Sequence, residues 1–218
     1  TSLLIDEWIK TNKMNQYRNI DSGMMSPSSS INKGIKNSKN KLIAYMDCGL
    51  EIPKNWLMSN YKLLNKAESD IVSTVIYTAG KSIIDQSFIS QTYGYQNKTV
   101  CLPGSLINKK VFNKIGYLIE SVRAGYDIDF VNKLKKSNIK RVVNRDIALK
   151  YYNFNYCQTF LSGFKKVYLY SLSGWKTKGD IKPAIYISMF FLFLISMYLE
   201  SYYLLILYLL TRGFMIPF

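Results

Sequence analysis

The sequence predicts an α/β protein in which helices flank a mostly parallel β-sheet, followed by transmembrane helices toward the C-terminus. Three observations support this fold class. Helical patterns alternate with short apolar runs through the first two thirds of the chain, an order typical of parallel sheets. The run at residues 41–47 is apolar and closes on an acid, as expected of a buried strand whose carboxyl end carries a functional turn. From Pro183 to Leu210 the only charged residue is Glu200.

The residue composition excludes several classes of catalytic and metal-binding site. The 218-residue chain contains no histidine, which excludes Ser-His-Asp and Cys-His catalysis and a histidine-ligated metal centre. Its three cysteines stand far apart, which argues against a zinc ribbon or a disulfide scaffold. The formal net charge is +15, but the basic residues are mostly scattered lysines, so nucleic-acid binding is not favoured. Carboxylates are therefore the expected catalytic groups.

The expected elements follow one another in a regular order. Apolar residues at helical spacing predict helices, and short β-branched runs predict strands. We expect helices at residues 2–10, 31–35 (with the N-cap among residues 28–30), 53–65, 109–114 and 126–136, and strands at residues 16–20, 41–47, 70–77 and 99–102. Residues 80–98 are polar and aromatic and are expected to form a loop, and Pro103 and Gly104 a turn.

The apolar run at residues 183–210 predicts contact with a membrane. One straight helix of this length would span about 42 Å, compared with about 30 Å of bilayer hydrocarbon. We therefore expect two segments that turn near Glu200 and Ser201, and a buried core helix is the alternative. Lysines crowd the approach to the first segment, which places the preceding residues in the cytoplasm by the positive-inside rule. These lysines stand at positions 165, 166, 176, 178 and 182.

Two aspartates are candidates for chemistry on position alone. Asp47 closes the strand at residues 41–47, where it could hold a hard cation or simply bond backbone amides in the turn. Asp127 falls on the apolar face of the helix at residues 126–136, in its first turn. Burial there raises the pKa of a carboxyl group while the helix dipole favours its charge, an environment expected of a general base. A helix-capping role is the alternative for Asp127, and Asp129 faces the lysine-bearing side.

Several segments together resemble the family 2 glycosyltransferases. The resemblance begins at Ser30-Ile31-Asn32-Lys33-Gly34-Ile35 and continues through Leu42-Ile43-Ala44-Tyr45-Met46-Asp47-Cys48-Gly49. The segment at residues 106–117 and the run Gly125-Tyr126-Asp127-Ile128-Asp129-Phe130, similar to G-E-D-x-D-L, complete it. The resemblance covers residues 1–145 and implies a GT-A-like fold that binds a nucleotide sugar. The family's first strand has no counterpart, so we expect an N-terminal truncation.

The resemblance also implies roles for individual residues. Asp127 matches the catalytic base, Asn32, Gly34 and Asp47 match donor-binding positions, and Gly104 and Tyr126 fall on the acceptor side. Asp47, with Glu51 in support, would bind a divalent cation such as Mn²⁺ or Mg²⁺. The sequence departs from the family's pattern at three points. Asp47-Cys48-Gly49 stands in place of the D-x-D motif, and Tyr126 stands in place of a Glu. No Q-x-x-R-W motif follows, which disfavours a processive polysaccharide synthase.

These observations predict an inverting glycosyltransferase at the cytoplasmic face of the inner membrane, with a role in cell-envelope polysaccharide synthesis. It would transfer one sugar from a nucleotide-sugar donor to a lipid-linked or saccharide acceptor. We expect a catalytic domain at residues 1–160, a basic aromatic juxtamembrane segment at residues 161–182, and transmembrane segments at residues 183–218. The alternative is a membrane-tethered binding or scaffold protein that kept the fold and lost catalysis.

Overall fold

The structure is a computed structural model, and it describes most of the chain as far as residue 151 and a helix beyond it. The described residues are 2–13, 17, 19–20, 23, 25–78, 80, 85–86, 89, 98–100, 102–122, 124–151, 162, 165, 182–199, 202–203 and 206–207. The predicted juxtamembrane segment and the predicted turn at Glu200 and Ser201 lie almost entirely outside these residues.

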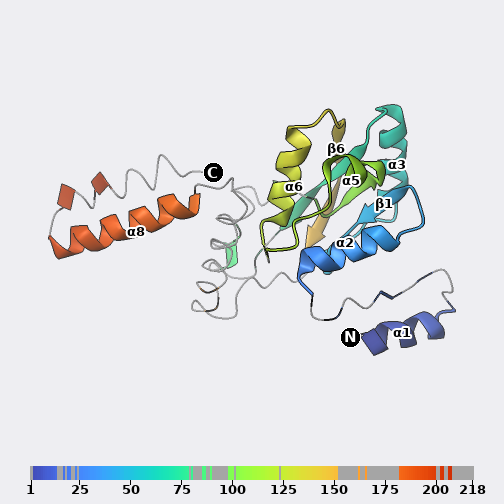
Figure 1. Ribbon diagram of the computed structural model, residues 1–218, viewed down its shortest axis with the longest axis horizontal. Helices are drawn as coiled ribbons and strands as arrows, with labels where there is room; N and C mark the ends of the chain where they lie inside the picture. The colour runs from blue at the N-terminus through green and yellow to red at the C-terminus, as the bar shows by residue number, and fades with distance from the viewer. Residues whose placement is uncertain are drawn as a thin grey trace.

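A mixed six-stranded sheet forms the centre of the fold (Figure 1). Its strands run in the order β1-β5-β3-β6-β2, and β4 also pairs with β3. Only β3 and β6 are parallel, whereas the pairs β1–β5, β3–β5, β3–β4 and β2–β6 are antiparallel. The strands are β1 (Leu42–Tyr45), β2 (Leu50–Glu51), β3 (Ile71–Thr78), β4 (Lys98–Thr99), β5 (Ser105–Asn108) and β6 (Arg141–Tyr151).

The prediction of a mostly parallel sheet is therefore wrong. β1 is an end strand that pairs antiparallel with β5, because the chain returns through the Gly104 turn and runs back along it. A strand is expected at residues 99–102, but β4 lies slightly earlier and β5 follows the turn. The strand β6 was not predicted, and residues 17, 19 and 20 of the expected strand at 16–20 belong to no strand.

Helices cover both faces of the sheet. α3 (Trp56–Lys66) packs on one face, where Leu64 contacts Val72 and Leu106 in a buried cluster. On the opposite face, Ile35, Phe112 and Phe130 share a cluster with Ile71. These three residues belong to α2 (Pro27–Asn37), α5 (Lys110–Ile115) and α6 (Tyr126–Lys135). Side chains alternate between faces along a strand, so neighbouring residues of β3 enter different layers.

A buried hydrogen-bond network attaches α3 to the sheet. The Thr74 hydroxyl accepts from Trp56 Nε1 at 2.9 Å and from Asn60 Nδ2 at 3.1 Å. Asn144 Nδ2 in turn donates to Asn60 Oδ1 at 2.9 Å. Asn144 lies opposite Thr74 where the register shifts, since Val75 pairs with Ala148. The network therefore fixes α3, β3 and the irregularity of β6 relative to one another.

The two remaining helices are α1 (Ser2–Thr11) and α8 (Lys182–Tyr198). α1 agrees with the predicted N-terminal helix. α8 lies away from the sheet and its helices in Figure 1, and it exposes Phe190, Phe191, Leu194 and Ile195. Among the described residues, no helix combines the length and the apolar character that crossing a bilayer requires. The predicted transmembrane segments are thus not seen in this part of the chain.

The buried network leads to a prediction about stability. Replacing Thr74 with Val keeps the side-chain shape but leaves the Trp56 N–H and one Asn60 N–H without their acceptor, so the free energy of unfolding should fall by about 2–4 kcal/mol. Thr78→Val is the matched control, because the buried Thr78 hydroxyl has no hydrogen-bond partner among the described residues. That control should be neutral or slightly stabilising. Urea unfolding followed by circular dichroism measures both, and equal losses would contradict the role of the network.

Candidate active site

Asp47 lies in the turn that follows β1, with a tyrosine hydroxyl near each carboxylate oxygen. The hydroxyl of Tyr151, the last residue of β6, donates to Asp47 Oδ2 at 2.8 Å. The hydroxyl of Tyr45, the last residue of β1, lies 3.5 Å from Asp47 Oδ1. Gly104 N–H donates to the Tyr45 carbonyl at 2.8 Å, which ties the end of β1 to the turn before β5. The position of Asp47 is therefore set by residues from three separate parts of the chain.

Asp127 occupies the first turn of α6 and is partly buried. Gly125 precedes the helix with φ +80°, a backbone conformation that suits glycine. Burial raises the pKa of Asp127 above that of an ordinary carboxyl group. The backbone N–H groups of Ile128 and Asp127 lower it, and the negative charge of Asp47 raises it further. The carboxyl group is thus a stronger base than an exposed aspartate.

The two predicted aspartates lie near enough for their charges to interact. The charge of Asp47 acts on Asp127, and both carboxylates act on Tyr45. Burial raises the pKa of Tyr45 above its usual range, and the charges of Asp47, Tyr126 and Asp127 and a hydrogen bond with Tyr126 add to the effect. The Tyr45 hydroxyl therefore stays protonated and can donate a hydrogen bond at any physiological pH.

A second set of contacts holds the segment that leads to Asp127. Asn32 is 1 % exposed. Its Nδ2 donates to the Leu118 carbonyl and to Glu120 Oε1, both at 2.8 Å, and its Oδ1 accepts from Leu118 N at 3.1 Å. Ser29 Oγ donates to Glu120 Oε2 at 3.1 Å. These hydrogen bonds lower the pKa of Glu120, and together they attach α2 to the connection between α5 and α6.

Asn32 thus has a structural role in this arrangement, because its amide is occupied by protein groups. Contact with a donor stays a prediction for this residue. Gly34 lines a hollow of about 560 Å³ along β1, with Lys39, Asn40 and Ile43 among its neighbours. A contact of Gly34 with the donor also remains a prediction.

Gly104 and Glu51 were predicted to serve the acceptor and a metal. Gly104 has φ +76°, and a Cβ at this position would collide with the Leu149 side chain, so backbone shape and packing require glycine here. Glu51 is exposed on β2, opposite Lys150 in the strand register. A direct role in binding stays a prediction for both residues.

The side chains around Asp47 do not fit a divalent cation held by protein ligands. Mg²⁺ and Mn²⁺ prefer several oxygen ligands in nearly octahedral geometry. Among the described residues, no group of three or more Asp, Glu, Cys or His side chains is placed to hold such an ion. Gly49 offers no side chain, and Asp47 Oδ2 already accepts from Tyr151.

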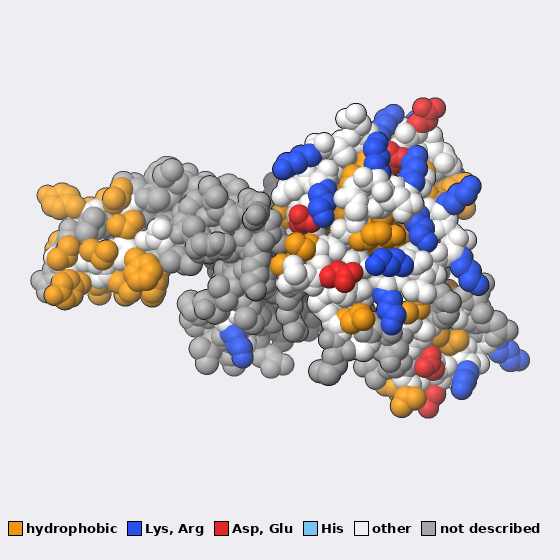
Figure 2. Space-filling model, in the orientation of Figure 1, with side chains coloured by type: hydrophobic (Ala, Val, Ile, Leu, Met, Phe, Trp, Pro, Cys, Tyr) orange, Lys and Arg blue, Asp and Glu red, His pale blue; other side chains and the backbone are white. Residues whose placement is uncertain are grey.

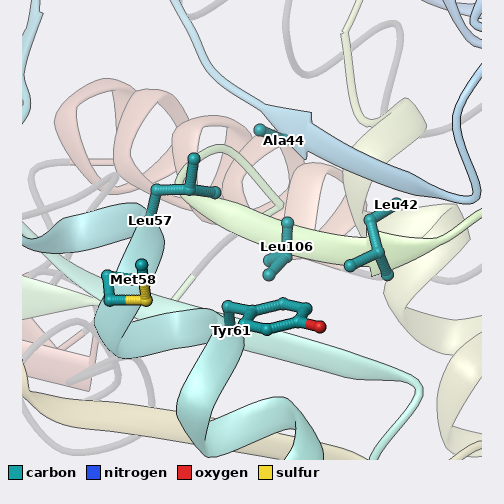
Figure 3. A pocket seen from close by; sticks show the side chains of 6 residues that line it. All are labelled: Leu42, Ala44, Leu57, Met58, Tyr61 and Leu106. Atoms are coloured by element: carbon teal, nitrogen blue, oxygen red, sulfur yellow. The ribbon is translucent and has the colours of Figure 1, made fainter.

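A separate apolar hollow lies on the α3 face of the sheet. Its volume is about 390 Å³, and Figure 3 shows its side chains between α3 and strands β1 and β5. The lining residues are Leu42, Ala44, Leu57, Met58, Tyr61 and Leu106. Tyr45 belongs to the buried cluster on the other face with Ile35 and Phe130, so this hollow is not part of the carboxylate site.

Two residues that help to form the site were not predicted from the sequence. Tyr151 is separated from Asp47 by 104 positions, and Glu120 from Asn32 by 88. Neither pair forms a local motif. The available signal for Tyr151 was the β-branched pair Val142 and Val143, which indicates a strand that could carry a tyrosine to the sheet edge.

Comparisons with known proteins identify the fold. No protein-family model and no curated protein sequence matches the chain. Solved structures of TarS from S. aureus, a glycosyltransferase, are similar. The alignment with TarS 1-349 covers 68% of this chain and 47% of the TarS chain, at 18% identity and TM-score 0.51. The alignment with TarS 1-349 in complex with UDP-GlcNAc covers 77% of this chain and 53% of the TarS chain, at 15% identity and TM-score 0.51.

A third solved structure, of TarS, aligns with 78% of this chain and 31% of its own at 16% identity and TM-score 0.50. The chain therefore shares the GT-A-like fold of these structures. It spans between about a third and a half of the length of these solved chains.

The coupling between the two aspartates can be tested by titration. In Asp47→Asn one negative charge near Asp127 is removed, so the pKa of Asp127 should fall relative to the unmodified protein. Carbon-13 NMR of the aspartate carboxyl groups follows that titration directly. Asp146→Asn, which neutralises an exposed acid on β6, should leave the Asp127 curve in place. An Asp127 pKa that stays constant or rises in Asp47→Asn would show that the two groups are not coupled in this way.

Proposed function

We propose that the protein is an inverting glycosyltransferase of the family 2 kind. It transfers one sugar, of the hexosyl type, from a nucleotide-sugar donor to a lipid-linked or saccharide acceptor. The observation that carries the proposal is the pairing of Asp127, whose pKa is raised by burial, with Asp47 on a GT-A-like fold. TarS, which has this fold, has been solved with UDP-GlcNAc, and this supports a nucleotide-sugar donor here.

Asp127 acts as the general base in this proposal. Its carboxylate takes the proton from an acceptor hydroxyl while that oxygen attacks the anomeric carbon of the donor sugar. The bond from this carbon to the diphosphate breaks on the opposite side, so the sugar configuration is inverted. A base with a raised pKa accepts the proton more readily, and general base catalysis contributes roughly 10² to 10⁴ in rate.

The position of Asp127 supports this role. α6 begins at Tyr126, and the contacts of Asn32 with Leu118 and Glu120 hold the preceding connection. The Tyr45 hydroxyl lies 3.5 Å from Asp47 Oδ1, and Tyr126 hydrogen-bonds with Tyr45 beside it. The base is thereby held by a rigid part of the fold, as efficient proton transfer requires.

Replacing Asp127 tests the proposal. Asp127→Asn keeps the side-chain shape but removes the base, so kcat for sugar transfer should fall by roughly 10²- to 10⁴-fold while donor affinity changes little. Asp129→Asn is the matched control, two positions further along α6. Asp129 pairs with Lys133 at 2.8 Å within α6, so its replacement should leave kcat unchanged. Equal turnover by Asp127→Asn and the unmodified protein would rule out Asp127 as the base.

We also propose that α8 binds the cytoplasmic face of the inner membrane. Its 17 residues would extend about 26 Å, and its described side chains include exposed Phe190, Phe191 and Met197. Figure 2 shows hydrophobic side chains gathered on α8, whereas lysines and arginines spread over the face of the sheet region in view. A positively charged protein with an apolar helix is suited to an anionic lipid surface.

Sedimentation with lipid vesicles tests the membrane proposal. The full chain should sediment with vesicles that contain phosphatidylserine and bind less to pure phosphatidylcholine. The double variant Phe190→Asn, Phe191→Asn should lose most of this binding, on the order of tenfold or more, because two large apolar side chains are removed. Leu57→Asn with Met58→Asn changes an exposed apolar pair on α3 and should bind as the unmodified protein does. A chain that stays in solution with both vesicle types would contradict the proposal.

A further inference from the structure

Asp47 is surrounded by hydroxyl donors where a metal-dependent site would present further acids. Tyr151 donates to Oδ2 at 2.8 Å, and the Tyr45 hydroxyl lies 3.5 Å from Oδ1. The two tyrosines end β6 and β1, so both hydroxyls are carried to the same carboxylate by the sheet. The Tyr151 contact is the stronger of the two, because it is short and its acceptor is charged.

The other groups near Asp47 are poor partners for a cation. Gly49 stands where a second acid would complete a D-x-D motif. Asp127 is partly buried at the start of α6 and is committed to proton transfer in the proposed function. Glu51 is exposed on β2 and stands opposite Lys150. A divalent ion at Asp47 would therefore receive one carboxylate from the described residues, and that carboxylate would first have to leave Tyr151.

The tyrosine hydroxyls also weaken the electrostatic effect of the Asp47 charge on its surroundings. An ionised carboxylate next to a diphosphate repels it, and a bound cation removes this repulsion in metal-dependent enzymes. Hydroxyl groups directed at the carboxylate disperse part of its charge instead. Tyr45 is buried, so its hydroxyl is held beside this carboxylate by the packing around it.

We propose that tyrosine hydroxyls, and not a divalent cation, hold the Asp47 carboxylate, so that this site binds a nucleoside diphosphate without a metal. The proposal rests on the proposed function for the identity of the ligand. Tyr151 is then a positioning residue, since it acts on the donor through Asp47.

Calorimetry with the metal alone tests the first half of the proposal. Titration of MnCl₂ into the full chain should give no binding at millimolar concentration. Gly49→Asp restores the second acid and should bind Mn²⁺ at least tenfold more tightly than the unmodified chain. A Cβ at position 49 meets no atom within 4 Å, and aspartate tolerates the φ of +84° better than most residues. Mn²⁺ binding by the unmodified chain as tight as that of Gly49→Asp would overturn the proposal.

Calorimetry with UDP tests the second half. The affinity of the full chain for UDP should agree within twofold in EDTA and in MnCl₂. Tyr151→Phe should weaken UDP binding on the order of tenfold, because the charge of Asp47 is left uncompensated. Tyr61→Phe, which removes an exposed hydroxyl on α3, is the matched control and should bind UDP normally. Circular dichroism confirms that both variants fold.

The outcomes separate this proposal from the proposed function. UDP binding that requires Mn²⁺, or equal affinities in Tyr151→Phe and Tyr61→Phe, would overturn the tyrosine proposal and leave the transferase proposal standing. An unmodified chain that binds neither Mn²⁺ nor UDP would support the absence of a metal at Asp47 and would contradict the nucleotide-sugar donor.

Discussion

The buried amide of Asn144 is the constraint on which the arrangement of the site depends. It donates to Asn60 on α3 and lies at the point where β6 changes its register against β3. Beyond this point, Tyr151 pairs with Leu50 on one side and with Thr78 on the other. The register of β6 beyond the irregularity therefore determines which of its side chains reaches Asp47. A buried polar network of this kind specifies one arrangement, because each alternative leaves donors and acceptors unpaired.

The two aspartates occupy different environments within one site. Asp47 accepts a hydrogen bond from Tyr151 and lies near Tyr45, whereas Asp127 is partly buried and has its pKa raised. Enzymes that move a proton and stabilise charge in the same step often place two carboxylates in different surroundings. Here that difference in surroundings arises from the fold. One acid follows an end strand, and the other begins a helix held by α2.

The sequence predicted the local features well and the long-range ones poorly. The helices at α1, α2, α3, α5 and α6 agree with their periodicity to within a few residues, and Asp127 lies in the first turn of α6 as its spacing indicated. The direction of β1 was wrong, because an apolar run such as residues 42–45 looks the same in a parallel and an antiparallel pair. The contact of Tyr151 with Asp47 could not be predicted, since it depends on the register of β6, and β6 was not recognised as a strand.

The outer edge of β1 links the fold to the colloidal behaviour of the protein. β1 lies at one end of the strand order, so its outer backbone groups have no strand partner among the described residues. Such an edge can pair with the same edge of another copy, and charged side chains beside it oppose this pairing. Exposed lysines occupy positions 39 and 41, immediately before the strand. Because salt screens repulsion between exposed charges, the protection that these lysines give to the β1 edge weakens as the ionic strength rises.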